Sequence, residues 1–426
     1  KLALKKELEQ WEHIRMGKFP IVIGTRSAIF APVLNLGLIV IDNEENESYK
    51  QEQTPHYHAC EVARMRSDIG RCEMIMASSL PRAETWAQAE REGWERVTLT
   101  EKNSVEVKIV DMNNYNPRKT SLVSFPLQNR IQKTLDGGGK VVLFMNRIGF
   151  STRTHCQKCD FTLKCDRCNV LLSYLYSKNQ MVCRHCNFTR ELPKKCPNCQ
   201  SAYLKSTGRG VEKLEREMAR LYPCARIYHY DRQSKVFPKT ADIIITTQAI
   251  FRQHGSWSVP LVAILNFDAQ MHHLDFRAAQ KAFSLLVHLR RLATGEVVVQ
   301  TRMPDNYCVK AIKNMDFDQF YREELNLRKG LDLPPYQNLI AVGLRGADEE
   351  IVFERSTALF NKLNIPEKPV MDISDPHPDV HPKLRDKYRF TILLKGLSPE
   401  GILAHIKSSL KGFRKKGTIV TVNVNP

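Results

Sequence analysis

Residues 141–145 read Val141-Val142-Leu143-Phe144-Met145, an apolar run that is one strand long. Such a run between helical patterns is typical of a strand buried on both faces of a parallel sheet. The sequence predicts a helix before it, over Leu127–Leu135, and another after it, over Glu212–Leu221. Further strands are predicted near three apolar positions, which are Ile227, Ile243 and Val262. The alternation indicates an α/β fold around a parallel sheet.

Toward the N-terminus the same alternation continues through the first hundred residues. The predicted elements are a helix over Lys5–Met16, strands over Phe19–Ile23 and Leu36–Ile41, a helix over Ala59–Arg66 and a strand over Glu73–Met76. The strand at Phe19–Ile23 is expected to be buried. These elements predict a second parallel sheet.

Toward the C-terminus the composition changes at about Leu331, where Pro334 and Pro335 follow. A strand over Asn338–Gly343, a helix near Glu354–Lys362 and a strand over Tyr388–Leu394 predict a smaller α+β unit.

Between about His155 and Tyr203 a cysteine-rich insertion interrupts the central alternation. Eight of the twelve cysteines form four Cys-x-x-Cys knuckles, which are Cys156/Cys159, Cys165/Cys168, Cys183/Cys186 and Cys196/Cys199. Tetrahedral zinc takes four ligands at about 2.3 Å from sulfur, and one tight turn presents two of them. The sequence therefore predicts two closed, structural all-cysteine zinc sites.

The spacing leaves the pairing of the knuckles open between nested, sequential and interleaved arrangements. Iron in a rubredoxin-like site is the alternative metal, whereas a redox dithiol motif would occur singly. Four isolated cysteines are predicted to be buried thiols, namely Cys60, Cys72, Cys224 and Cys308.

The formal net charge of +18 favours a polyanionic partner, of which nucleic acid is the commonest. Nine Lys or Arg residues against three acidic residues lie between Cys156 and Lys205. The C-terminal segment adds Lys407, Lys411, Arg414, Lys415 and Lys416, with no acid after Glu400. The sequence predicts no membrane segment, because its longest apolar runs are strand-sized. It also shows no secretion leader behind Lys1, so we expect a cytoplasmic, nucleoid-associated protein.

The cysteine spacing C-x2-C-x5-C-x2-C-x14-C-x2-C-x9-C-x2-C resembles that of the PriA family of replication-restart helicases. Several segments in the same order are also similar to that family. They are Gly24–Ala28, Ser48–Gln51, Tyr57–Ala59, Asn146–Phe150, Asp275–Ala279, Leu333–Tyr336 and Val422–Pro426. The likeness covers nearly the whole chain, which we expect to be N-terminally incomplete.

The resemblance implies remnants of two RecA-like helicase lobes, a two-zinc module inserted in lobe 2 and a small C-terminal DNA-binding domain. The implied ranges are 1–115 for lobe 1, 116–154 with 204–325 for lobe 2, 155–203 for the module and 326–426 for the last domain. It also implies nested pairing, with Cys156, Cys159, Cys196 and Cys199 on one ion and Cys165, Cys168, Cys183 and Cys186 on the other. The predicted DNA-contacting residues are Arg26, Tyr49, Lys50, Arg147, Lys411, Arg414, Lys415 and Lys416.

The motor motifs of the family are degenerate. Its ATP- and Mg²⁺-binding phosphate loop, G-x4-G-K-[ST], does not occur in the sequence. The similar Gly137–Lys140 precedes a strand and lacks the hydroxyl that Mg²⁺ needs, so a helix-to-strand turn is predicted there. Where the family has D-E-E-H, this chain has Asp42-Asn43-Glu44-Glu45. Asn43 cannot accept a proton from water, and Glu44 is expected to point to the other face.

The other motor segments are altered as well. Ser78-Ser79-Leu80-Pro81 lacks the threonine of the family's S-A-T-P segment. The helix that should carry the arginine finger is shortened, and only Arg290 and Arg291 remain near its place. We therefore expect no confident catalytic residue and regard Asp42, Glu44, Arg290 and Arg291 as remnants.

The sequence thus predicts a replication-restart protein that binds forked DNA or junctions of single- and double-stranded DNA, with ATP hydrolysis lost. By resemblance its partners are primosome proteins and single-stranded-DNA-binding protein. Two alternatives are a working ATP-dependent 3′→5′ helicase and a zinc scaffold for protein partners.

Overall fold

The computed structural model describes residues 4–51, 53, 55–99, 105–115, 121–145, 153–159, 161–175, 180–183, 186, 188–207, 210–231, 234, 236–252, 257–272, 275–364 and 372–426. The chain divides into two compact units, Lys1–Trp94 and Glu95–Pro426. No helix within the described ranges is long and apolar enough to cross a membrane.

The first unit is built on two parallel strands, β1 (Leu38–Asp42) and β2 (Glu73–Ala77), in register from Leu38↔Glu73 to Asp42↔Ala77. Its helices are α1 (Leu4–Arg15), α2 (Ala59–Gly70) and α3 (Ala83–Glu92). Ile39 and Ile41 of β1 pack against Ala59 and Ala63 of α2 in a small core. The opposite side of β1 is solvent-exposed, because Leu38 and Val40 are 50% and 58% exposed.

One predicted strand of this unit is wrong. Residues 19–23 form no strand in the structure, and the side chains of Ile21 and Ile23 are 75% and 93% exposed. An apolar run becomes a strand only where a neighbouring strand takes up its backbone hydrogen bonds. Among the described residues of the first unit, β1 and β2 pair only with each other, and nothing pairs with residues 19–23.

The second unit contains a six-stranded parallel sheet in the order β10-β11-β4-β12-β13-β3, which confirms the predicted fold class at this level. Its strands are β3 (Glu106–Asp111), β4 (Val141–Phe144), β10 (Ile227–Tyr230), β11 (Ile243–Thr246), β12 (Val259–Ile264) and β13 (Ala293–Thr301). Every side chain of β4 and β11 is buried, as the apolar run at 141–145 predicts. The helices around it are α4 (Phe125–Asp136), α5 (Gly210–Leu221), α6 (Asp268–Met271), α7 (Ala278–Arg290), α8 (Tyr307–Asn314) and α9 (Phe317–Gly330).

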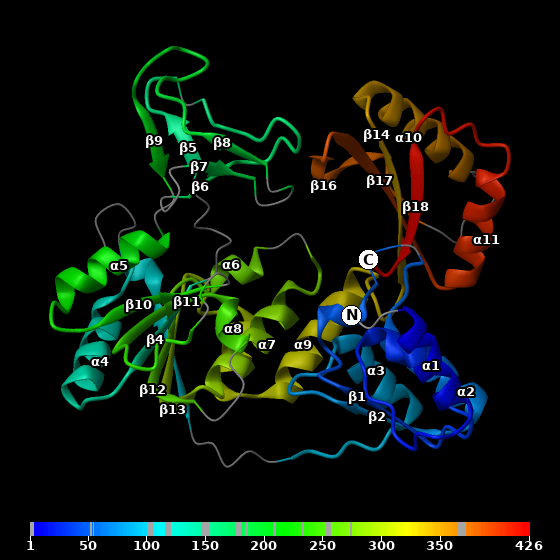
Figure 1. The fold of residues 1–426 in the computed structure, drawn as a ribbon, viewed down its shortest axis with the longest axis horizontal. Helices are drawn as coiled ribbons and strands as arrows, with labels where there is room; N and C mark the ends of the chain where they lie inside the picture. Colours follow the sequence, from blue (N-terminus) through cyan, green and yellow to red (C-terminus); the bar gives the residue numbers. More distant parts are fainter. Residues whose placement is uncertain are drawn as a thin grey trace. The chain divides into compact units, whose positions relative to one another are not determined.

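Helices cover both faces of this sheet. Leu127 and Ile131 of α4, with Leu214 and Met218 of α5, pack against Val141 and its neighbours on one face. Figure 1 shows α4 and α5 on that face, and α7, α8 and α9 beyond the other. Strand β3 follows the division of the two units at Trp94, and it pairs with β13 in the sheet of the second unit.

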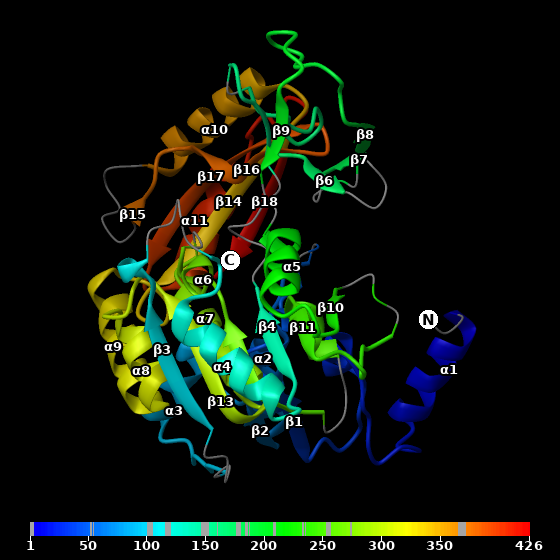
Figure 2. The ribbon, with the colours of Figure 1, turned by 90° about the vertical axis from the view of Figure 1, so that its left-hand side faces the viewer.

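The cysteine-rich insertion leaves the sheet after β4 and returns before α5. Strands β5 (Arg153–Cys156) and β9 (Leu204–Thr207) pair antiparallel and bring its two ends together. Between them β6 (Ser173–Leu175), β7 (Gln180–Val182) and β8 (Thr189–Glu191) form a small antiparallel sheet. The insertion is therefore a module of its own, whose strands can be followed in Figure 2.

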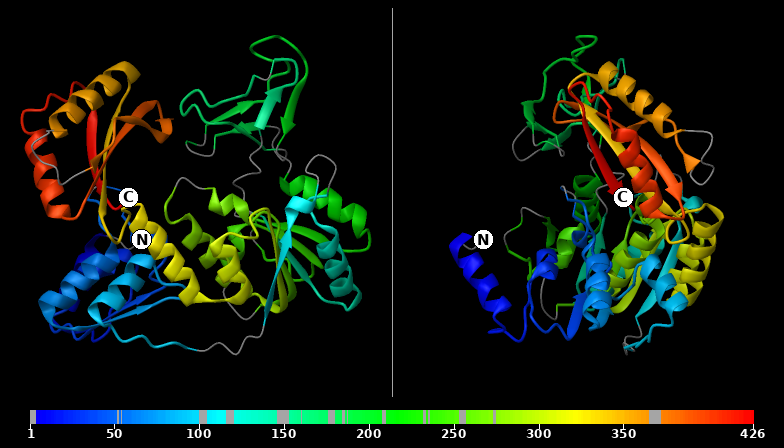
Figure 3. Two further views of the ribbon diagram at one scale, coloured as in Figure 1. Left: turned by 180° about the vertical axis from the view of Figure 1, so that it is seen from behind. Right: turned by 90° about the vertical axis from the view of Figure 1, so that its right-hand side faces the viewer.

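The C-terminal part is an antiparallel sheet in the order β15-β17-β14-β18, with β16 also paired to β17. Its strands are β14 (Asn338–Gly346), β15 (Asp372–Ile373), β16 (His377–Leu384), β17 (Lys387–Gly396) and β18 (Ile419–Val424). Helices α10 (Glu349–Leu363) and α11 (Pro399–Leu410) pack on the sheet through an apolar core that includes Ile340, Leu359, Ile392 and Ile406. Figure 3 shows both helices against the sheet.

Candidate metal centres and the remnants of a nucleotide site

The eight knuckle cysteines gather into two groups of four. The outer group contains Cys156, Cys159, Cys196 and Cys199, and the inner group contains Cys165, Cys168, Cys183 and Cys186. Within each group all four sulfur atoms lie within 4.8 Å of one another. Of the three arrangements that the spacing allows, the structure has the nested one.

One backbone turn recurs in all four knuckles and explains how each pair of thiols is presented. The N–H of the first cysteine donates to the carbonyl five residues later, for instance from Cys156 to Phe161 and from Cys165 to Val170, both at 2.8 Å. Cys183 and Cys196 make the same bond to Phe188 and Ser201. The turn therefore depends on local spacing, which is why the sequence alone can predict it.

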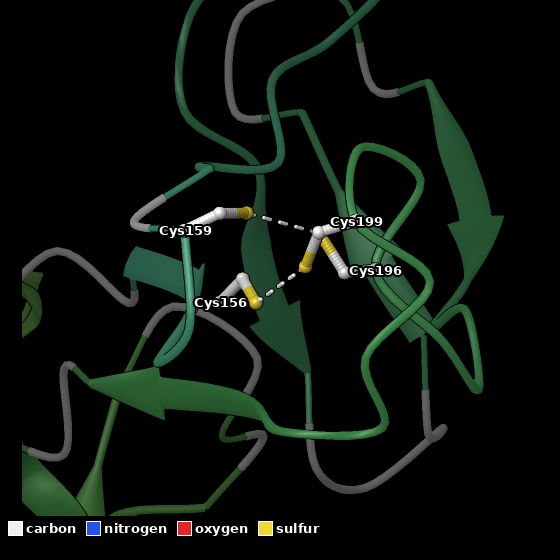
Figure 4. A group of neighbouring side chains, drawn as sticks. All are labelled: Cys156, Cys159, Cys196 and Cys199. Carbon is white, nitrogen blue, oxygen red and sulfur yellow. Dashed lines mark hydrogen bonds between the residues drawn. The ribbon is translucent and has the colours of Figure 1, made fainter.

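The sulfur positions of the outer group suit a tetrahedral metal ion. The Sγ atoms of Cys156 and Cys199 lie 3.5 Å apart, and those of Cys159 and Cys196 lie 3.6 Å apart. Figure 4 shows the four side chains pointing toward one another. A tetrahedron with metal–sulfur bonds of 2.3 Å has edges of about 3.8 Å. In the inner group the Sγ atoms of Cys165 and Cys186 are 3.7 Å apart, so both groups could hold a metal ion.

Hydrogen-bond donors from outside the groups point at the sulfur atoms. Lys158 donates its backbone N–H to Cys156 Sγ at 3.4 Å, and Asn198 donates its side-chain amide to Cys159 Sγ at 3.6 Å. The backbone N–H of Phe161 and the Asn198 amide lower the pKa of Cys159 to about 6. Such bonds favour the thiolate, which is the form that binds metal.

A donor to the inner group comes from a distant part of the chain. The backbone N–H of Arg385, in the turn between β16 and β17, donates to Cys168 Sγ at 3.4 Å. Nothing in the local spacing around Cys168 signals this partner, because the two residues are 217 positions apart.

The Asp42–Glu45 segment begins at the last residue of β1 and continues beyond the strand. Asp42 and Asn43 are exposed, and the Asn43 side-chain amide donates to the Asp42 carboxylate at 3.1 Å. Asn43 has a left-handed backbone with φ 50°. An amide has no basic lone pair, so Asn43 at this position cannot take a proton from water.

Glu44 is fully buried, and its carboxylate is occupied by bonds within the fold. It accepts from the Arg82 backbone N–H at 2.5 Å, from Arg82 Nε at 2.8 Å and from the Thr85 hydroxyl at 3.1 Å. The Glu44 carboxylate raises the pKa of the largely buried Arg82 guanidinium, although desolvation opposes this effect. Glu44 is therefore one half of a buried ion pair.

Glu45, which sequence analysis did not single out, links the Asp42–Glu45 segment to Ser78 and Ser79. Its carboxylate accepts from the hydroxyls of Ser78 and Ser79 at 2.6 Å and 3.3 Å. Through Glu44 and Glu45, the four-residue segment thus contacts residues that follow β2 in the chain.

The remnants at the end of α7 are integrated into the fold of the second unit. Arg290 is the last residue of the helix, and its Nε donates to the Val105 carbonyl at 3.2 Å. Arg291 is exposed, and β13 begins at Ala293. A Cβ atom added at Gly295 would lie 2.6 Å from the Pro260 carbonyl oxygen, so close strand packing requires this glycine.

Gly137–Lys140 connects α4 to β4, as the sequence predicts. Gly138 has φ +70°, and a Cβ at Gly139 would lie 2.9 Å from Thr134 atoms. Lys140 donates its ammonium group to the Lys239 carbonyl. Gly138 and Gly139 therefore allow the chain to turn between α4 and β4.

The predicted DNA-contacting residues of the first unit are partly engaged within it. Arg26 Nη1 donates to the carbonyls of Ser48 and Lys50 at 2.8 Å and 2.5 Å. Tyr49 donates its hydroxyl to the Asp42 carbonyl at 2.7 Å. Lys50 is half-buried and forms an isolated bridge with His58. Arg147 lies outside the described residues.

The predicted basic residues of the C-terminal sheet lie in the segment between α11 and β18. Lys411, Arg414, Lys415 and Lys416 are all exposed. Phe413 packs against the apolar core of this sheet, and Lys362 lies over its ring at 5.9 Å. The structure thus anchors the segment by one aromatic ring and leaves four cationic side chains in solvent.

The four isolated cysteines are not all buried. Cys60, Cys72 and Cys308 are buried as predicted, but Cys224 is exposed, which corrects the prediction for that residue. Cys224 lies in the turn between α5 and β10, directly after Pro223.

No family model matches the chain. Comparison with curated proteins finds "Replication restart protein PriA" of Bacillus subtilis at 30% identity, over 100% of this chain and 56% of the relative. The protein of the same name from Thermotoga maritima is 30% identical over 99% of this chain and 58% of the relative. That from Treponema pallidum is 30% identical over 100% of this chain and 67% of the relative.

The chain thus spans between about half and two thirds of the length of these relatives. The similarity runs through the first unit, the parallel sheet, the cysteine module and the C-terminal sheet alike. From this coverage and identity, the chain belongs to the PriA family.

Proposed function

We propose that this chain acts in replication restart as a DNA-binding protein that holds two zinc ions and does not hydrolyse ATP. The observation that carries the proposal is the similarity, over the whole chain, to proteins named for replication restart. The proposed DNA is a fork or a junction of single- and double-stranded DNA, and the proposed partners are primosome proteins and single-stranded-DNA-binding protein.

In this proposal the first unit is part of helicase lobe 1, and the parallel sheet of the second unit is lobe 2. A parallel sheet covered by helices on both faces supports the assignment of lobe 2, and two parallel strands packed against a helix support that of lobe 1. The cysteine module and the C-terminal sheet would carry the DNA-binding surfaces. Exposed Lys411, Arg414, Lys415 and Lys416 support a phosphate-contacting role for the C-terminal sheet.

Zinc is the proposed ion because each group consists of four thiols whose sulfur atoms lie within 4.8 Å of one another, as many ligands as a closed tetrahedral site needs. Cys156, Cys159, Cys196 and Cys199 would hold one ion, and Cys165, Cys168, Cys183 and Cys186 the other. With no position left for water or substrate, the ions would stabilise the module, whose apolar core is small.

The loss of hydrolysis is supported by three features of the side chains present. Asn43 stands where a water-activating carboxylate is needed, and Glu44 is buried in its pair with Arg82. Arg290 donates to a backbone carbonyl of its own sheet. These features support the loss of hydrolysis because phosphoryl transfer needs a water-activating base and an arginine at the reacting phosphate.

One titration tests the proposal. Labelled forked DNA is added to the chain across a salt series without nucleotide, and phosphate release is measured in the same samples after Mg²⁺-ATP is added. We expect salt-sensitive fork binding and phosphate release at background. Release with unwinding would instead establish the working helicase, and failure to bind forks even at low salt would favour a zinc scaffold for proteins.

A further inference from the structure

The hairpin turn between β16 and β17 contacts the inner cysteine group, although it belongs to the C-terminal sheet. The turn consists of Arg385 and Asp386, whose φ angles are 51° and 62°. Leu384 and Lys387 pair on either side of it, so the loop has two residues. Two-residue hairpins with both central residues left-handed usually contain Asn or Gly. An Arg-Asp sequence in such a turn needs contacts that hold it there.

Three hydrogen bonds join the turn and its flanking Lys383 to one knuckle of the cysteine module. Arg385 donates its backbone N–H to Cys168 Sγ at 3.4 Å, and Asp386 donates its backbone N–H to the Arg167 carbonyl at 3.0 Å. Lys383 donates its ammonium group to the Asp166 carbonyl at 3.1 Å. Three consecutive residues of the knuckle thus accept hydrogen bonds from one turn.

Apolar packing accompanies these bonds. Leu384 packs against the buried cluster of the module that contains Leu163, Cys165, Cys168 and Cys183. The cluster is small, so one added leucine covers a substantial part of its surface. The turn therefore closes one side of the inner cysteine group with both a donor and an apolar side chain.

The geometry of the knuckle makes this contact depend on the metal. A small all-cysteine module folds around its ion, so the positions of Cys168 Sγ and of the Asp166 and Arg167 carbonyls depend on metal binding. Nearby Asp166 pairs with Arg190, and Arg167 lies over the Phe188 ring. The three acceptors are therefore held together for the turn when the inner group binds its ion.

We infer that the β16–β17 turn is a positioning element for the inner metal group, and that metal occupancy and docking of the C-terminal sheet on the module stabilise each other. The inference rests on the proposed metal binding and names the contact through which it acts. Linkage requires the effect in both directions: removal of the turn from the knuckle weakens metal retention, and removal of the inner metal releases the turn. Metal in the module thereby restricts where the C-terminal sheet lies relative to it.

The first arm of the test measures metal release. The full chain is first analysed for its metal content, and release to a coloured chelator is then followed over time. Leu384→Asp should speed release of one of the two ions by about 10-fold, since partners of metal ligands contribute about 10- to 100-fold to affinity. Val380→Asp is the matched control, because Val380 lies on the same strand β16 but is 64% exposed. It should release both ions at the rates of the unchanged chain.

A second variant tests whether the backbone N–H of Arg385 acts without the Arg385 side chain. Arg385→Gly keeps the N–H and accepts the left-handed conformation, so it should retain metal nearly as the unchanged chain does. Equal release rates for Leu384→Asp and the unchanged chain would overturn the inference.

The second arm measures the turn itself by hydrogen exchange. Cys186→Ser should empty the inner group and raise the exchange rates of the Arg385 and Asp386 amides, whereas Cys199→Ser should empty the outer group and leave them protected. Equal protection in both variants would refute the linkage. If the chain binds two ions but the turn and the inner group do not affect each other, this inference alone is wrong. If the chain binds no metal, the proposed metal binding is wrong as well.

Discussion

The cysteine module and the Asp42–Glu45 segment both carry chemically active side chains at short spacing, but the fold uses them in opposite ways. In the module, all eight thiols converge into two groups of four. In the segment after β1, Asp42 and Asn43 face solvent, Glu44 turns into the interior toward Arg82, and Glu45 bonds to two serines. The same density of functional residues therefore produces two candidate sites in one region and structural contacts in the other.

The comparison shows that convergence, more than residue type, identifies a site. A buried carboxylate that is bonded by three donors is not available to activate water, because it lies away from solvent and most of its lone pairs are occupied. A thiol surrounded by three other thiols has no such competing role and is stabilised when a metal ion joins them.

Loss of one inner thiol should have the largest effect. Cys165→Ser should lower the metal content from two ions to one per chain and unfold the module locally, because metal binding supplies much of the folding free energy of such modules. Elemental analysis measures the ion count, and hydrogen exchange over residues 163–192 measures the local unfolding.

The parallel sheet of the second unit is the internal control in this variant. Its amides in β4 and β11 should stay protected, because its core does not depend on the module. If the Cys165→Ser chain still bound two ions, the contrast between the cysteine module and the Asp42–Glu45 segment would be lost.

Removal of the buried carboxylate should come next. Glu44→Ala leaves the Arg82 guanidinium without its partner, and breaking a buried pair in this way costs about 3–5 kcal/mol. Hydrogen exchange of the β1 and β2 amides should report this loss of stability in the first unit. Glu45→Ala is the control, since loss of bonds to two half-exposed serines should cost about 1 kcal/mol. Equal stability of the two variants would contradict a structural role for Glu44.

Neutralising the basic C-terminal segment should have a moderate effect on DNA binding. Replacing Lys407, Lys411, Arg414, Lys415 and Lys416 by Ala should weaken fork binding and reduce the salt slope by about 0.7 to 0.9 for each DNA phosphate that the variant no longer neutralises. The matched control replaces exposed Lys313, Arg322 and Lys329 on α8 and α9, and it should change the slope less. An unchanged slope in the first variant would exclude this segment from the DNA interface.

Restoring one catalytic group should have no effect on hydrolysis. Asn43→Glu supplies the missing base, but the sequence contains no G-x4-G-K-[ST] loop, and Arg290 is bonded to Val105. Loss of an arginine finger alone lowers the rate about 10^3- to 10^5-fold. Phosphate release with saturating forked DNA and Mg²⁺-ATP should therefore stay at background. Activity in this variant would mean that only the base is missing.

Local patterns in the sequence determine much of this protein. The apolar run Val141–Met145 predicts a buried central strand because its side chains have no polar alternative, and β4 is buried throughout. The Cys-x-x-Cys spacing predicts each knuckle, because the turn that presents the two thiols closes within five residues. The order of these segments also identifies the PriA family. All of these properties depend on neighbours along the chain.

The tertiary structure decides what depends on distant partners. Spacing allows three pairings of the knuckles, and only the paired ends β5 and β9 and the small sheet between them bring the nested groups together. Residues 19–23 have the composition of a strand but no strand beside them, so they stay exposed. Glu44 accepts hydrogen bonds from Arg82, which is 38 positions away in the sequence, and Cys168 Sγ accepts one from Arg385, which is 217 positions away. Hydrogen bonds and ion pairs act over a few ångströms, so the folded path of the chain determines which of these groups meet.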